Sequence, residues 1–386
     1  MKANELLIVQ GTDYKNMAYA ILEEADLAGR IPSKDTRIGL KPNIVGLALP
    51  EDGATTHPEV TAGVIEYLKA HGFMNIAILE GSWVGDRTME AAALIGYDRL
   101  CETYGVPLID MQAQNGVRTD CAGMELEIGA AALDIDFWIN LPVLKGHCQT
   151  KITCALKNMK GLLPNREKRR FHRLGLHEPI GHLAAGIRQD FILVDSICGD
   201  LTLEDGGNPI RQDRLIAAVD PVLCDAYGCS ILGIDPTAVP YIGIACALGA
   251  GSMDLSGAVI RKFVYEQSPE GSLRSFEEGV DHDPDVRGGF KEVMTLADNV
   301  CEVESCSACY GCLIPALEQL RREGLLDRLQ EKIAIGQGYR GKSGELGVGN
   351  CTKGFRHTLA GCPPTQEQMA QFLREYILSS DEVKES

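Results

Sequence analysis

Several common features are missing from this sequence of 386 residues, and each absence excludes a class of protein. No run approaches the roughly 18 consecutive apolar residues of a membrane span. Residues 1–16 turn polar too soon for a signal peptide, and we therefore expect a cytoplasmic protein. The net charge is −17, whereas binding along nucleic-acid phosphates requires a positively charged surface. Neither a membrane nor a nucleic acid is expected as a partner.

A phosphate-binding P-loop is also missing. The segment 336–349 is rich in Gly, but it lacks the G-x4-G-K-[ST] spacing with which backbone N–H groups surround a nucleotide's phosphates. We expect this segment to be a flexible loop.

The pattern of apolar residues predicts an α/β protein with a mainly parallel sheet. Short apolar runs alternate with helical patterns through the first half of the chain, including one helix expected over 88–104. The length allows two or three domains. We expect an α/β ligand-binding region of one or two lobes over 1–265, a linker over 266–290, and a small Cys-bearing iron–sulfur domain over 291–386.

Polar residues follow several of the expected strands at the points where the strands end. Lys41 and Asn43 follow one strand, Glu80 follows the next along the chain, and Asp195 follows a later one. In open α/β sheets, ligands bind at the carboxyl ends of the strands. We therefore expect a binding site at this edge. The strands concerned are expected over residues 37–40, 75–79 and 191–194.

One segment carries a concentrated positive charge. Residues 145–173 contain five Lys and four Arg against a single acid, Glu167, so their formal charge is +8. The segment follows a strongly apolar strand expected over 136–141. Positive charge gathered inside an acidic protein predicts contact with an anion. We expect this basic segment to form the wall of a site for a small anionic ligand.

Two lysines of the basic segment lie where their charges interact. Lys157 and Lys160 are i, i+3 neighbours on one face of an expected helical turn. Their repulsion lowers their pKa values unless an anion lies between them, which suits anion binding or a Lys used as base or nucleophile. The residues expected to bind the ligand are Lys41, Asn43, Lys145, Asn158 and Lys160.

Histidines are the other candidate catalytic residues. A His beside so much positive charge is biased toward its neutral form, which acts as a general base or a metal ligand. We expect His177 and His147 to join Lys157 as the catalytic group. His57 belongs either to the site or only to the entrance of a helix whose first turn tolerates Pro58.

Three cysteines have the spacing of an iron–sulfur loop. Cys306, Cys309 and Cys312 form a C-x2-C-x2-C run, in which a short loop presents three thiolates to a [4Fe–4S] cluster. Structural zinc is the competing interpretation, although zinc sites prefer two C-x2-C pairs. The fourth ligand of a cluster often precedes a proline. The candidates for it are Cys362, which does so, then Cys351 as its rival, and Cys301.

A set of short motifs resembles the family known as domain of unknown function 362. The similarity covers most of residues 35–250, and the box ALKNMKG is its most specific element. It implies an α/β protein and an iron–sulfur cluster, because members often carry ferredoxin-like Cys motifs, but it implies no particular reaction. The motifs are KPNIV, TTHPEV, LPVLKGH, TCALKNMKGLLP and AVDPVLCDAYG, together with Asp195 at its strand end.

The chain is also similar, more distantly, to the lactate racemase family. That family has a Thr-x-Pro box before a helix and a His upstream of a Lys that carries a tethered nickel-pincer nucleotide. The similarity implies Lys157 as the tether and His147 as a nearby histidine. However, the residues from Ala155 to Asn158 replace the Gly-rich approach of that family, which argues against nickel chemistry.

Two functional hypotheses follow. The first is a [4Fe–4S] protein with a redox or electron-transfer role, coupled to a small anionic ligand in the α/β region and to a redox partner protein. The second is a non-redox isomerase or lyase that uses Lys157 and a His, with a cluster that is only structural.

Overall fold

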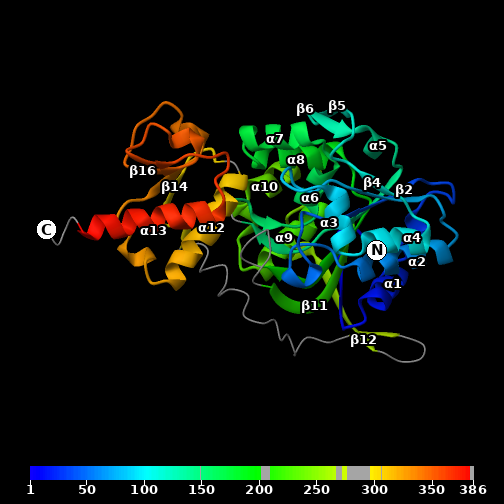
Figure 1. The fold of residues 1–386 in the computed structure, drawn as a ribbon. Coiled ribbons are helices and arrows are strands. Elements are labelled where there is room, and N and C mark those ends of the chain that lie inside the picture. Colours follow the sequence, from blue (N-terminus) through cyan, green and yellow to red (C-terminus); the bar gives the residue numbers. More distant parts are fainter. Residues whose placement is uncertain (148, 201–208, 267–271, 276–295, 306, 383–386) are drawn as a thin grey trace. The chain divides into compact units, whose positions relative to one another are not determined.

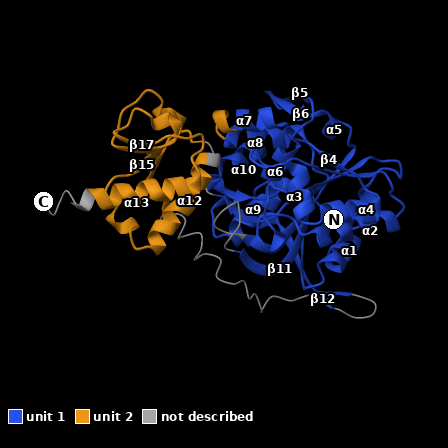
Figure 2. Cartoon of the chain, in the orientation of Figure 1, with its two compact units in different colours: residues 1–171, 176–286 blue, residues 172–175, 287–386 orange. Residues whose placement is uncertain are grey.

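The structure, a computed structural model, describes residues 1–147, 149–200, 209–266, 272–275, 296–305 and 307–382. The chain forms two compact units (Figure 2). The first unit contains Met1–Phe171 and Leu176–Val286, and the second contains His172–Gly175 and Arg287–Ser386.

A nine-stranded sheet forms the centre of the first unit, as far as its residues are described (Figure 1). Most neighbours are parallel, but β11 runs antiparallel to both of its neighbours, and the edge strand β13 runs antiparallel to β12. The expected mainly parallel α/β sheet is therefore confirmed. In the order in which they pair, the strands are β13 (Ser272–Ser275), β12 (Val259–Glu266), β1 (Glu5–Gln10), β11 (Pro209–Ala218), β10 (Phe191–Asp200), β7 (Phe137–Leu141), β2 (Ile38–Pro42), β3 (Ile76–Glu80) and β4 (Leu108–Asp110).

Helices cover both faces of this sheet. Alternate strand residues such as Leu7, Val9 and Leu40 share one buried core with four helices, α1 (Tyr14–Glu24), α2 (Pro58–Ala70), α3 (Thr88–Leu94) and α4 (Tyr97–Tyr104). On the other face, α6 (Ala155–Asn158) contacts β7, and α9 (Pro221–Ile231) contacts β11. The remaining helices are α5 (Ala130–Leu133), α8 (His177–Gly186), α10 (Pro240–Ala247) and α7 (Asn165–Leu174), of which the last three residues count with the second unit.

The helix expected over 88–104 is wrong, because the structure has two helices there. The first, α3, ends before Gly96, whose φ of +86° lies in the left-handed region that glycine adopts without strain. The chain changes direction at this residue and starts α4.

The carboxyl ends of the parallel strands meet at one edge of the sheet. β2 pairs in parallel with β3 on one side and with β7 on the other, so the ends of these three strands are neighbours. β10 is longer than expected and pairs with β7 only at its start, so Asp195 lies just beyond the end of β7, beside Val143. The edge therefore carries the polar residues that the sequence placed at strand ends.

The basic segment folds into several short elements after β7. It forms a hairpin of β8 (Lys145–His147) and β9 (Lys151–Thr153), then α6, a single 3-10 turn η3 (Met159–Leu162), and α7. A second hairpin outside the main sheet pairs β5 (Gly116–Cys121) with β6 (Met124–Gly129).

The second unit is a small α/β unit. Its parallel sheet pairs β14 (Val300–Glu302), β15 (Ile333–Ile335), β16 (Leu346–Val348) and β17 (His357–Leu359) in that order. Two helices that contact each other, α12 (Ser307–Arg322) and α13 (Gln366–Glu382), belong to the same unit.

None of the helices in the described parts of the chain combines the length and the apolar character needed to cross a membrane.

Gly63 allows α1 and α2 to pack closely. A Cβ at this position would overlap the backbone carbonyl oxygen of Lys15 and come within 2.9 Å of the Cβ of Ala18. We expect Gly63→Ala to lower the free energy of unfolding by about 1–3 kcal/mol, because the backbone of α1 must shift. Urea unfolding monitored by circular dichroism measures this change.

Gly243, in the helix α10, is the matched control. A Cβ there would meet no atom within 4 Å, so Gly243→Ala gains helix propensity without a clash. We expect that variant to be as stable as the parent or more stable by up to about 1 kcal/mol. Equal effects of the two substitutions would contradict the packing argument.

Candidate active site

A buried ion pair joins the ends of two neighbouring strands. Lys41, near the end of β2, pairs through Nζ with the carboxylate of Glu80, the last residue of β3. Lys41 Nζ also donates to the carbonyl oxygen of Pro42 at 2.7 Å, and Glu80 Oε1 accepts the N–H of Gly81 at 2.7 Å. The side chains are 0% and 4% exposed. Burial outweighs the attraction of Glu80 and lowers the pKa of Lys41.

Asn158 attaches the ALKNMKG box to this pair. Its Nδ2 donates to the carbonyl oxygen of Lys41 at 2.9 Å and to Asn140 Oδ1 at 2.7 Å. Asn140, opposite Lys41 in the register of β7, donates in turn to Ala155 O at 2.9 Å and Gln189 Oε1 at 2.6 Å. The helix α6 is thus fixed to both β2 and β7 by buried amide groups.

Gly161 lets the same box approach the ion pair. A Cβ on Gly161 would overlap Glu80 Oε1 and come within 2.6 Å of Lys41 Nζ. A glycine leaves the two charged side-chain ends where they are, which gives a physical reason for the last residue of the box.

Lys168, on α7, is a further buried lysine at this edge. Its Nζ donates to the carbonyl oxygens of Gly81 at 2.6 Å and Ser82 at 2.8 Å. Burial lowers the pKa of Lys168 to about 7, although Glu80 opposes this shift. The sequence gives no sign that Lys168 is buried, because a Lys among Arg residues in a polar helix resembles a solvated surface residue.

His57 and Asp195 form a second buried pair at the same edge. His57 immediately precedes α2, and its Nδ1 lies 2.8 Å from Asp195 Oδ2. The same oxygen accepts the backbone N–H of His57 at 2.8 Å, and Asp195 Oδ1 accepts the N–H of Ile197 at 3.0 Å. The carboxylate is fully buried, so its orientation, and with it that of the imidazole ring, is fixed.

The pair changes the acidity of the imidazole. Burial by itself lowers the pKa of His57, but the charge and hydrogen bond of Asp195 outweigh burial and raise the pKa above its usual value. Asp195 also fixes a proton on Nδ1, which leaves Nε2 as the nitrogen that can gain or lose a proton.

Tyr14 packs edge-on against His57, with ring centroids 5.5 Å apart. Its hydroxyl donates to Asp213 Oδ1 at 2.6 Å and accepts a hydrogen bond from Arg211. Burial and Asp213 raise the pKa of Tyr14 to about 12, so this phenol stays protonated at neutral pH.

The loop before His57 connects the pair to expected ligand-binding residues. Thr56 Oγ1 donates to Leu141 O and accepts the N–H of Asn43, both at 2.8 Å. Asn43 Oδ1 is buried and has no hydrogen-bond partner in the described structure. Lys145 Nζ, also buried, donates to Ala54 O at 2.7 Å, three residues before His57.

His147, one of the expected catalytic residues, is held by the turn that follows it. His147, at the end of β8, is buried, and its Nδ1 accepts the backbone N–H groups of Gln149 and Thr150, both at 3.1 Å. Its Nε2 must therefore carry the proton of the neutral ring.

Lys157, His177 and Lys160 lie on α6, α8 and η3. Lys157 Nζ donates to Thr153 Oγ1 at 2.9 Å, and the ring of His177 stacks on Tyr241 with centroids 5.9 Å apart. These contacts are with residues of β9 and α10.

The structure thus brings together residues that the sequence left in separate places. Asp195 was expected at the edge, and His57 was left between two interpretations. Nothing in the sequence indicates that they touch, because 138 residues separate them. The only sequence signals are a His at a helix entrance and an Asp at a strand end.

In the second unit, three Cys-bearing segments meet. The position of a Cβ on Gly349 would lie 3.3 Å from Cys309 Sγ, so the loop that leads to Cys351 touches α12. Asn350 donates its N–H to Gly361 O at 2.8 Å, and Gly361 donates its N–H to Asn350 Oδ1 at 3.0 Å. Cys351 and Cys362 each follow one of these paired residues. Cys312 lies one turn after Cys309, and Cys306 lies outside the described residues.

Comparison with known proteins identifies the family. The family described as "Domain of unknown function (DUF362)" matches residues 38–230, which is half of the chain. This chain belongs to the DUF362 family. The matched range contains Lys41, His57 and Asp195, so the DUF362 region includes both buried pairs.

Two further proteins are similar to this DUF362 member. A thylakoid-associated protein of Synechocystis sp. is 27% identical over 245 residues, which cover 59% of this chain and 73% of that protein. The lactate racemase apoprotein from Thermoanaerobacterium thermosaccharolyticum is 16% identical, with a TM-score of 0.37 over 58% of this chain. The match spans 56% of the racemase chain, and a likeness at this level decides neither the fold nor the chemistry of the DUF362 protein.

The Lys41–Glu80 pair gives a stability prediction. Lys41→Met leaves the Glu80 carboxylate buried without its cation, and we expect this to lower the free energy of unfolding by about 3–5 kcal/mol. The control is Arg87→Ala, which removes an exposed ion pair with Glu90. This substitution should change the free energy of unfolding by less than about 1 kcal/mol. Urea unfolding at neutral pH measures both, and a similar small loss in both variants would contradict the structural role of the buried pair.

Proposed function

We propose that the α/β unit is an enzyme that transfers a proton to or from a small carboxylic acid, with His57 as the acid–base residue. The observation that carries this proposal is the buried His57–Asp195 pair at the carboxyl edge of the parallel strands. A buried carboxylate that fixes the tautomer and orientation of a histidine is a recurrent arrangement in acid–base catalysis.

The proposed proton transfer uses Nε2 of His57. Above its raised pKa the neutral imidazole takes a proton from a carbon next to the substrate carboxylate, and the electron pair stays on that carbon. The resulting imidazolium remains paired with Asp195, which stabilises its charge. Return of the proton to the same carbon, or loss of a neighbouring leaving group, gives isomerisation or elimination. This reaction class matches the second of the two hypotheses from the sequence, with His57 as the proton carrier.

Neighbouring groups support an anionic substrate. Lys145 places an ammonium group beside the loop that leads to His57, and this charge favours a carboxylate and the electron-rich intermediate. Asn43 Oδ1 is a buried acceptor that no described residue donates to, and a hydroxyl or amino group of the substrate would supply the donor. The proposal therefore favours small carboxylic acids that carry such a group.

Lys157, His147 and His177 remain alternative proton carriers. Lys157 and His177 lie on contacting helices, and His147 lies in β8, which contacts β10. They are included as variants in the experiment on His57.

A second proposal concerns the second unit, which we infer holds a [4Fe–4S] cluster and passes electrons to a partner protein. It is supported by the contact of Cys309 with the loop before Cys351 and by the paired backbone of Asn350 and Gly361. These contacts join the three chain segments that carry Cys309, Cys351 and Cys362, which favours ligation of one cluster by cysteines of all three. Such a cluster supplies one-electron transfer when it is bound.

The His57 proposal predicts the loss of proton exchange in variants of the pair. Small carboxylic acids with 2-hydroxy or 2-amino groups are incubated with the full-length protein in D₂O, and deuterium incorporation is followed by ¹H NMR. We expect exchange on at least one of these acids, and a fall of about 10²–10⁴-fold in His57→Gln. His71→Gln, at the other end of α2, should retain the activity. Exchange that survives in His57→Gln but disappears in Lys157→Ala, His147→Gln or His177→Gln would assign the proton to that residue instead.

The pair also predicts a pH effect that does not depend on a substrate. Asp195→Asn removes the charge that raises the pKa of His57 but leaves its burial, so we expect the imidazole pKa to fall below its usual value of about 6.5. The raised pKa stabilises the folded state fully below about pH 6.5, and this contribution disappears as the pH rises through the pKa of folded His57. NMR titration of the imidazole and urea unfolding across this range measure both effects. An unchanged imidazole pKa in Asp195→Asn would rule out the proposed coupling.

The cluster proposal predicts a brown protein after anaerobic purification, with iron and sulfide present. We expect Cys309→Ser to lose the broad visible absorbance, whereas Cys246→Ser, in the α/β unit, should keep it. Comparison of Cys351→Ser with Cys362→Ser then identifies the fourth ligand, with EPR of the reduced protein as the readout. A colourless protein that contains zinc at this site would exclude the cluster.

A further inference from the structure

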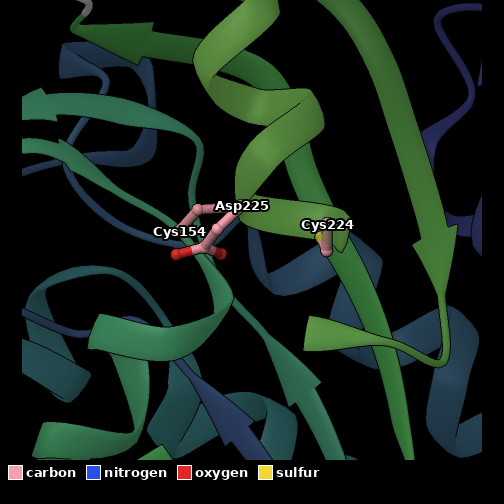
Figure 3. A group of neighbouring side chains, drawn as sticks. All are labelled: Cys154, Cys224 and Asp225. Carbon is pink, nitrogen blue, oxygen red and sulfur yellow. The ribbon is translucent and has the colours of Figure 1, made fainter. Parts of the chain in front are cut away.

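A buried group of two thiols and one carboxylate lies outside the proposed acid–base site. Cys154 Sγ, Cys224 Sγ and a carboxylate oxygen of Asp225 all lie within 4.8 Å of one another (Figure 3). The three residues are 1%, 2% and 0% exposed. Among the described residues, this is the one group of His, Cys and acidic side chains with the geometry to hold a metal ion.

The fold brings these residues together from two segments. Cys154 directly precedes α6, and Cys224 and Asp225 are consecutive residues of α9. The two helices contact each other, and Asp225 Oδ1 accepts the backbone N–H of Leu156 at 3.3 Å. Asp220 caps α9 by accepting the N–H groups of its first turn, which fixes where the helix begins.

One oxygen of the Asp225 carboxylate has no hydrogen-bond partner among the described residues. Its Oδ2 is buried without a hydrogen-bond partner in the described structure, although a buried carboxylate is costly unless a cation or donors compensate it. Burial raises the pKa of Asp225 to about 7, and contact with Cys224 together with burial raises the pKa of the Cys154 thiol well above its ordinary value. When the thiols and the carboxyl group lose their protons, the free Oδ2 and the two sulfur atoms can act as ligands of a cation.

We propose that Cys154, Cys224 and Asp225 form a site for a thiophilic divalent cation, with zinc the best match. Two thiolates and one carboxylate are ligands that Zn²⁺ accepts. Together with the dication they leave a net charge of −1. On binding, the metal displaces the two thiol protons and any proton on Asp225, which pass to solvent. Because the site is closed to water, the metal enters while the chain folds.

The site would fix the position of the ALKNMKG box. Asp225 holds the N–H of Leu156, and the same short helix carries Asn158, which binds the backbone of Lys41. On this basis, metal bound between α6 and α9 stabilises the helix on which the buried network at the sheet edge depends. Tyr241 lies beside the same carboxylate, and its hydroxyl donates to Ile152 O at 3.2 Å. Tyr241 therefore connects β9 to the surroundings of Asp225.

A proton is the competing occupant. If Asp225 is protonated, its O–H can donate to Cys154, and the group is then a neutral part of the core that holds no metal. The two occupants differ in composition, so elemental analysis separates them.

The experiment measures metal in the full-length protein, produced in zinc-supplemented medium and purified without chelator. All variants also carry Cys309→Ser, which disables the cysteine group of the second unit and removes its metal from the count. We expect about one zinc per chain in this background, and its loss on Cys224→Ala. Cys229→Ala, a buried cysteine on the same helix but outside the group, should retain the zinc.

A second variant keeps the proposal testable if Cys224→Ala fails to fold. Asp225→Asn keeps the size of the side chain but removes its charge, and we expect it to lose most of the zinc while circular dichroism shows a folded protein. Cobalt in place of zinc should give thiolate-to-metal absorbance that is absent in Cys224→Ala. The proposal is overturned if the protein with intact Cys154, Cys224 and Asp225 contains neither zinc nor cobalt. It is also overturned if all variants contain equal amounts of zinc. Neither result bears on the activity of His57, so the two proposals fail independently.

Discussion

The buried ion pair between Lys41 and Glu80 is the interaction on which the order of the sheet edge depends. Two opposite charges at the ends of neighbouring parallel strands are buried together, and neither charge is tolerated there without the other. The amide of Asn158 binds the backbone of Lys41, and Gly161 leaves the space that the pair needs. The sequence presented Lys41 and Asn158 as ligand-binding residues, whereas the structure shows both in a buried network that holds the edge in place.

This network explains how a basic segment fits inside an acidic protein. Its buried lysines lie beside partners from elsewhere in the chain: Lys145 donates to Ala54 and Lys168 to Gly81 and Ser82. The lysines that are concentrated in one segment of the sequence are therefore spread, in the fold, along the edge of the sheet where the parallel strands end. The His57–Asp195 pair lies at that edge, and the cation of Lys145 beside it suits the anionic substrate that we propose.

The two units present different kinds of chemistry. The α/β unit buries a His–Asp pair, whereas in the second unit a Cys-bearing helix and two Cys-bearing loops contact one another. If both proposals hold, the chain combines proton transfer with electron transfer, and both hypotheses from the sequence describe part of one protein. The thiols at Cys154 and Cys224 are a separate case, because the hydrogen bond with Cys224 and burial raise the pKa of Cys154, and a metal would have to displace its proton.

The sequence by itself determined the mainly parallel α/β architecture, the polar residues at strand ends, and the spacing of Cys306, Cys309 and Cys312, because these depend on local periodicity and on short-range spacing. Only the tertiary structure decided which of those residues touch. His57 meets Asp195 because β10 runs beside β7 while α2 begins at the same edge, and Asp225 meets Cys154 because α6 packs on α9. Such pairs depend on strand order and helix packing, which no short stretch of sequence encodes.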